Sequence, residues 1–223
     1  MLLRQLSTLA AFTIPAMGLA QISVFDAAYR LEADARSGTS FDTHSSFSNS
    51  VGPAQTFFDQ VDSFANDGAS SVHSWANVSW NCTPTDLDAE LVACWDSFDF
   101  GAGNSGHMLS RLFLGITLSA VNFVSTSATF DQPNSTAAID MWNGSTWVQI
   151  VSPTQIQSYS ALWNPGDYRL RAQRLYNPTG NSTGCPPFAF HLHAAPVPEP
   201  TSILAMGAGM AVLLRRRKAS LAA

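Results

Sequence analysis

Apolar and polar residues alternate with a period of two along much of the chain. In residues 27–36 small or apolar side chains occupy the odd positions, and Arg30, Glu32 and Asp34 are among the even ones. This is the pattern of a strand with one buried face. It recurs in residues 72–80, 112–118, 168–173 and 188–193. Asn143-Gly144, between the apolar runs 139–142 and 147–150, further predicts a β-hairpin.

The segments between these runs favour turns and loops. Residues 37–71 and 178–187 are rich in Ser, Thr, Gly, Asn and Pro, so we expect long loops there, with a short helix over 55–65 as the one helical candidate. Seven or eight short strands separated by turns predict an all-β fold, an antiparallel β-sandwich of jelly-roll type over residues 21–193.

Both ends of the chain have the composition of targeting segments. Residues 1–20 contain one arginine, an uncharged stretch and small residues at Gly18 and Ala20, which predicts a signal peptide cleaved between Ala20 and Gln21. At the other end, a proline-rich linker over 194–200 leads into the uncharged segment 201–214.

A basic cluster then follows, made of Arg215, Arg216, Arg217 and Lys218. The 14 residues of 201–214 would span about 21 Å as a helix, short of the ~30 Å hydrocarbon core, and snorkelling arginines can close part of the gap. We therefore expect a single short transmembrane helix over 201–214. The positive-inside rule places the tail 215–223 in the cytoplasm and the body outside.

Pro198, Glu199 and Pro200, followed in order by the apolar segment and the basic cluster, resemble the PEP-CTERM sorting domain. The resemblance implies a Gram-negative bacterium and an exosortase, a membrane transpeptidase-like enzyme, as the partner. It also implies a transient inner-membrane anchor and then delivery to the cell surface or the extracellular matrix of a biofilm. It covers the last 27 of 223 residues and implies no activity for the rest.

Charge excludes one class of partner. Five of the 11 basic residues lie at the two ends, so residues 21–196 carry six arginines and no lysine against 15 acids. A body with that balance repels phosphate, and we expect no nucleic-acid partner.

The three cysteines lie in the exported part. Cys82 and Cys94 are 12 residues apart, and we expect a disulfide between them, which leaves Cys185 over or lets it exchange partners.

Carboxylates and histidines offer two metal interpretations. Asp86, Asp88 and Glu90 have the spacing of one strand face and are weak candidates for calcium, although a solvated acidic rim is the favoured interpretation. His191 and His193 share a strand face with no third ligand nearby in the sequence, so solvent-facing histidines are favoured over zinc ligands. We assign no metal and no other cofactor.

A glycine-rich turn contains Ser105, and His73, Asp88 and Ser105 follow the order of a serine-protease triad. An ordinary turn serine is favoured, because a triad is defined by geometry and not by order. A secreted hydrolase that uses Ser105 is therefore a minor alternative. The leading interpretation is a non-enzymatic surface or matrix protein.

Six tryptophans support a further alternative, a carbohydrate-binding module of the exopolysaccharide matrix, because aromatic rings stack on sugars. They are Trp75, Trp80, Trp95, Trp142, Trp147 and Trp163.

Overall fold

A computed structural model describes residues 21–68, 70–98, 103–130, 134–180, 182–185 and 188–197, together with Ala208 and Met210. The expected signal peptide, the Pro198, Glu199 and Pro200 motif and the basic cluster lie outside the described residues. Of the expected membrane helix only Ala208 and Met210 are described, and both are helical. Within the described part of the chain, no helix is long and apolar enough to cross a membrane.

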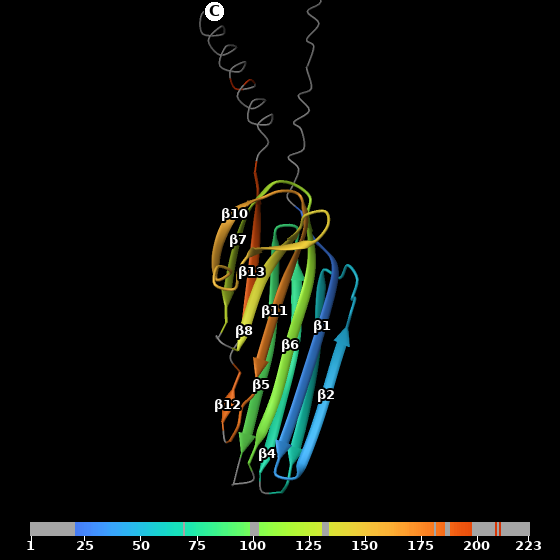
Figure 1. Ribbon diagram of the computed structural model, residues 1–223, viewed down its shortest axis with the longest axis vertical. Coiled ribbons are helices and arrows are strands. Elements are labelled where there is room, and N and C mark those ends of the chain that lie inside the picture. The colour runs from blue at the N-terminus through green and yellow to red at the C-terminus, as the bar shows by residue number, and fades with distance from the viewer. Residues whose placement is uncertain are drawn as a thin grey trace, which may run out of the picture. The chain divides into compact units, whose positions relative to one another are not determined.

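The described residues form strands that assemble into two antiparallel sheets (Figure 1). Sheet 1 has the order β2 (Ser40–Ser48), β1 (Ile22–Ser37), β6 (Ser105–Leu118), β11 (Gly166–Tyr176), β8 (Ser135–Trp142) and β9 (Trp147–Val151). Sheet 2 has the order β10 (Ser158–Trp163), β7 (Asn122–Thr129), β13 (Phe188–Pro196), β5 (Asp86–Phe98), β4 (Ser71–Cys82) and β3 (Thr56–Asn66), and the short β12 (Thr183–Gly184) also pairs with β5. The predicted all-β sandwich is confirmed, whereas its jelly-roll type stays a prediction.

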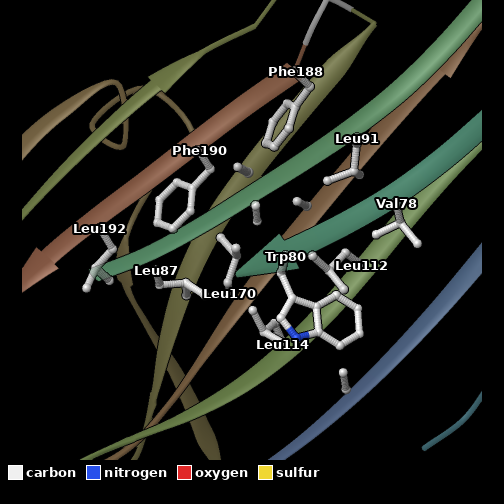
Figure 2. Packing of buried hydrophobic residues seen from close by; sticks show 14 of the residues in the cluster. Val78, Trp80, Leu87, Leu91, Leu112, Leu114, Leu170, Phe188, Phe190 and Leu192 are labelled. Atoms are coloured by element: carbon white, nitrogen blue, oxygen red, sulfur yellow. The ribbon is translucent and has the colours of Figure 1, made fainter. Parts of the chain in front are cut away.

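The core lies between the two sheets, where the period-two pattern turns one side chain in two inward. Figure 2 shows Trp80 of β4 beside Leu112 and Leu114 of β6, and Phe188 and Phe190 of β13 belong to the same core cluster. All five are at most 3% exposed. Trp80 stacks on Phe57 at 4.4 Å between ring centroids, and its indole NH donates to the Ala54 carbonyl at 2.9 Å. Burial of these alternating side chains, each contributing roughly 1.5–3 kcal/mol, is the main stabilising term.

The expected loop over residues 37–71 is wrong, because it contains β2 and β3, and so is the helix over 55–65. The inward positions of β3 include a serine, Ser63, which is 1% exposed and donates its hydroxyl to the Ala33 carbonyl at 2.5 Å. Backbone pairing and polar contacts of this kind stabilise β2 and β3. Their sequences therefore show little alternation of apolar and polar residues. At the other end of the body, β13 extends to Pro196, and the first three residues of the expected linker 194–200 are strand.

The predicted Cys82–Cys94 disulfide is also wrong, because Cys94 is bonded to Cys185 and Cys82 is a buried free thiol. The β4–β5 register places Cys82 opposite Leu87. Cys94 is seven residues further along β5, roughly 23 Å away at about 3.3 Å per residue. Burial raises the pKa of the Cys82 thiol to about 11, so the thiol stays protonated at neutral pH.

Cys185 reaches Cys94 through the short strand β12. That strand pairs Thr183 with Asp96 and Gly184 with Trp95, so the next residue, Cys185, comes opposite Cys94 with 4.3 Å between their Cα atoms. This separation is close to that of directly opposed residues in a non-hydrogen-bonded antiparallel pair.

Candidate functional site

The outer face of sheet 1 carries a groove beside an irregularity of β1. The pairing of β1 with β6 shifts register between Val24 and Asp26, and the intervening Phe25 lies on the outer face, 40% exposed. Its ring lies over Gly115 of β6, where an added Cβ would come within 2.5 Å of the Phe25 ring. Any larger residue at position 115 would therefore displace the ring.

The groove has a volume of about 310 Å³. Its lining comprises Phe25, Asp26, Ala27, Ala28, Phe113, Gly115, Trp147 and Arg169. Aromatic rings from three strands thus meet a carboxylate and a guanidinium in one open hollow. Trp142, 39% exposed, lies 5.5 Å from Trp147 between ring centroids on the predicted β8–β9 hairpin, which is confirmed.

Arg169 is held in place over the groove by a carboxylate beneath it. Its guanidinium carbon lies 4.7 Å from the Trp147 ring centroid, and its Nη2 donates to Asp140 Oδ2 at 2.7 Å. Arg171 donates to both oxygens of the same carboxylate, at 2.7 and 2.8 Å. Asp140 is only 2% exposed. Because two arginines share one carboxylate, the cluster keeps one net positive charge at a fixed position.

The electrostatics of Asp140 follow from this arrangement. Burial raises its pKa, but the hydrogen bonds and charges of Arg171 and Arg169 outweigh burial, so the pKa of Asp140 is lowered. The carboxylate is therefore ionised at any pH at which the groove would work in a living cell.

The tryptophans divide between core and surface. Trp80, Trp95 and Trp163 are buried, at most 4% exposed, and serve the core. Trp147 lines the groove and Trp142 lies beside Trp147, whereas Trp75 is half-buried on the outer face of sheet 2. The sequence singled out the tryptophans but missed Phe25, Phe113 and Arg169, because strand pairing, and not a local pattern, brings these residues together.

The three carboxylates Asp86, Asp88 and Glu90 do share the outward face of β5, as expected. The two histidines of β13 lie opposite the first two of them: His193 Nδ1 is 2.7 Å from Asp86 Oδ1, and His191 Nδ1 is 2.7 Å from Asp88 Oδ1. Among the described residues, no three His, Cys, Asp or Glu side chains stand as a ready-made group for a metal ion. The carboxylates therefore do not form the calcium site that their spacing suggested.

Ser105, His73 and Asp88 are not brought together. Ser105 begins β6 in sheet 1, opposite Arg36, whereas His73 belongs to β4 in sheet 2, where it lies 4.8 Å from the Trp75 ring and 3.5 Å from Asp62. His73 pairs with Asp96, and Asp88 is eight residues further along β5, roughly 26 Å away. The triad order in the sequence has no counterpart in space.

Comparison with known proteins identifies the end of the chain. Residues 196–218 match the PEP-CTERM protein-sorting motif. No curated protein and no solved structure gives a significant match. The motif implies processing by exosortase and an exported, surface-sorted protein.

Replacement of Asp140 by asparagine is expected to lower the free energy of unfolding at pH 7 by about 2 kcal/mol, because charged hydrogen bonds to two arginines are lost. The folded-state pKa of Asp140 is lowered, so its contribution is complete above the unfolded-state value of about 3.9 and is lost as the pH falls below it. Urea unfolding at pH 7 and pH 3 measures this. The free energy of unfolding of Asp140→Asn should lie further below that of wild type at pH 7 than at pH 3. The control Asp62→Asn, at a side chain 64% exposed, should change stability by less than about 0.5 kcal/mol. An equal loss of unfolding free energy at both pH values would contradict the role of the ionised Asp140 carboxylate.

Proposed function

We propose that this chain, which carries the PEP-CTERM protein-sorting motif at residues 196–218, is an exported surface or matrix protein that binds polysaccharide. The observation that carries the binding proposal is the groove between Phe25, Phe113 and Trp147 with Arg169 at its side. No enzymatic activity is assigned to the sandwich.

Polysaccharide fits the chemistry of the groove. A pyranose ring offers an apolar face of C–H groups, which packs on aromatic rings, and a rim of hydroxyls, which need both donors and acceptors. The groove supplies rings from β1, β6 and β9, the acceptor Asp26 and the donor Arg169. Since Asp140 fixes Arg169, little side-chain entropy is lost when a ligand binds.

The C-terminal segments provide the proposed route of the protein to the cell surface. We propose that segment 201–214 holds the exported chain in the inner membrane until exosortase processes it near Pro198, Glu199 and Pro200. Glu199 presents one distinctive charge between two prolines, which offer no backbone donors, and this suits a substrate recognised by an enzyme cleft. The body is then released to the cell surface or the exopolysaccharide matrix.

The binding proposal is tested by affinity electrophoresis of the full chain in gels that contain the exopolysaccharide of an exosortase-positive host. Trp147→Ala is expected to lower the affinity measured from the retardation about tenfold, because loss of one stacking ring removes about 1.4 kcal/mol of binding free energy. The control Phe64→Ala removes an aromatic side chain of sheet 2 that is 55% exposed, and should bind as wild type does. Equal retardation of wild type and Trp147→Ala, or an equal loss in both variants, would overturn the proposal.

The sorting proposal is tested separately by cell fractionation and immunoblotting. Glu199→Ala should accumulate in the inner membrane at full length, because the recognised charge is gone, while the neighbouring control Ser202→Ala should leave the membrane at the wild-type rate. Departure of Glu199→Ala at the wild-type rate in an exosortase-positive host would refute this role of the motif.

A further inference from the structure

The arginines of the sandwich all lie in sheet 1. The strands of sheet 2 contain six acids and no arginine or lysine. The six arginines of residues 21–196 are Arg30, Arg36, Arg111, Arg169, Arg171 and Arg174. At physiological ionic strength a charge is screened beyond about 8 Å, so an anionic ligand responds to the groups around it more than to the net charge of the body. Sheet 1 is therefore the face on which an acidic ligand can meet positive charge.

Three of these arginines lie around Phe113, one of the rings that line the groove. The guanidinium carbon of Arg169 is 5.9 Å from the centroid of the Phe113 ring. Arg171 is directly opposite Phe113 in the β6–β11 register, and Arg111 precedes it by two residues, on the same face of β6. On the β1 side the residue opposite Phe113 is Ala28, whose side chain is short. The ring is therefore bordered by arginines toward β11 and along β6, with only a methyl group toward β1.

Each of the three guanidinium groups is held through the same edge. Arg169 and Arg171 both donate from Nε and Nη2 to Asp140. Arg111 donates from Nε and Nη2 to the amide oxygen Oε1 of Gln173, at 3.0 and 2.8 Å. Within the described part of the chain, Nη1 of none of the three donates a hydrogen bond. A guanidinium has five N–H groups, so each arginine keeps the two of Nη1 for a ligand on a group that is already positioned.

The partners of these arginines leave positive charge uncompensated. Asp140 supplies one negative charge to both Arg169 and Arg171, and the partner of Arg111 is a neutral amide. Three guanidinium groups therefore share one carboxylate. That carboxylate is almost fully buried, whereas the side chains of Arg169 and Arg171 are 30% and 37% exposed, so the positive charge is the part that a ligand can reach.

Two further carboxylates give the groove a direction. Asp26 lies at the β1 end, where it accepts a hydrogen bond from the Ser50 hydroxyl at 2.7 Å. Asp167 accepts from the Thr117 hydroxyl at 2.7 Å, and it is four residues along β11 from the position opposite Phe113, roughly 13 Å away. A ligand in the groove thus meets an acceptor at β1 and donors toward β11 and β6.

From this arrangement we infer that the polysaccharide of the groove is acidic, with carboxylates on its sugar rings, as in a polymer of uronic acids. The inference rests on the proposed function, because it names the ligand chemistry of the same groove. A uronic acid carries its carboxylate on the rim of the pyranose. When the C–H face of the sugar packs on Phe113 or Trp147, the carboxylate extends sideways, where Arg169 lies with its guanidinium carbon 4.7 Å from the Trp147 ring centroid.

Charge then separates acidic from neutral sugars. A neutral sugar in this position would remove water from the guanidinium groups without compensating their charge, which costs free energy. A carboxylate replaces that water with charge-assisted hydrogen bonds, which guanidinium groups form well because of their planar geometry. The same aromatic rings would therefore bind the acidic sugar more tightly than its neutral counterpart.

The inference is tested by binding of the full chain, in an uncharged detergent, to polygalacturonate and to its fully methyl-esterified form, each immobilised on a biosensor. The ester keeps the sugar ring and removes only the charge. Wild type is expected to bind the acid about tenfold more tightly than the ester, and the preference should shrink as NaCl is raised from about 50 to 500 mM. Arg111→Gln should lower the affinity for the acid about tenfold and that for the ester less than about twofold.

The matched control is Arg36→Gln, which removes the same charge from an exposed position of the same sheet. Arg36 is six residues along β1 from the position opposite Arg111, roughly 20 Å away, so this variant should bind the acid as wild type does. Circular dichroism checks that each variant is folded, and Arg171→Gln replaces Arg111→Gln should the latter unfold.

Equal affinity of wild type for the acid and the ester, or an equal loss in Arg36→Gln and Arg111→Gln, overturns the inference. Should Trp147→Ala then still reduce the binding of both polymers, the groove binds polysaccharide without selecting its charge, and the proposed function stands alone. Absence of binding to both polymers and to the host exopolysaccharide overturns the inference and the proposed function together.

Discussion

The register of β13 on β5 is the constraint on which most of the molecule depends. One alignment pairs Thr183 with Asp96, His191 with Asp88 and His193 with Asp86, so it extends from β12 to His193 of β13. The same alignment brings Cys185 opposite Cys94 and turns Phe188 and Phe190 into the core. A slip by one residue would turn both phenylalanines outward, and a slip by two would separate the cysteines and both His–Asp pairs. The strand held in this way continues directly into the sorting motif, which begins at Pro196.

The two outer faces of the sandwich differ in chemistry although they belong to one fold. The strands of sheet 2 contain no arginine or lysine, and their exposed face carries aspartates, a glutamate and histidines. Sheet 1 carries Arg111, Arg169 and Arg171 beside exposed aromatic rings. A rigid sandwich can present both, because its core depends only on the inward half of each strand.

Sequence reasoning reached the parts of this structure that local patterns determine. Residues 27–36 and the Asn143-Gly144 hairpin were recognisable because alternation and turn chemistry act within a few residues. β2 and β3 were missed because polar residues such as Ser63 occupy inward positions, where partners from other strands satisfy them. The disulfide was mispredicted for a related reason: proximity in the chain suggested Cys82, but strand pairing places Cys94 beside a residue 91 positions away. The groove combines residues of β1, β6, β9 and β11, and the pairing of His193 with Asp86 depends on the alignment of β13 with β5. Neither is a property of a single segment.

Peptide mapping of the mature protein under non-reducing conditions tests the β5–β13 alignment most directly. The alignment predicts a single major cross-linked species, with Cys94 joined to Cys185, and a Cys82 peptide that is alkylated only after unfolding, because its thiol is buried. A major species that joins Cys82 to Cys94 or to Cys185 would contradict the alignment, and with it the pairing of both histidines with their aspartates.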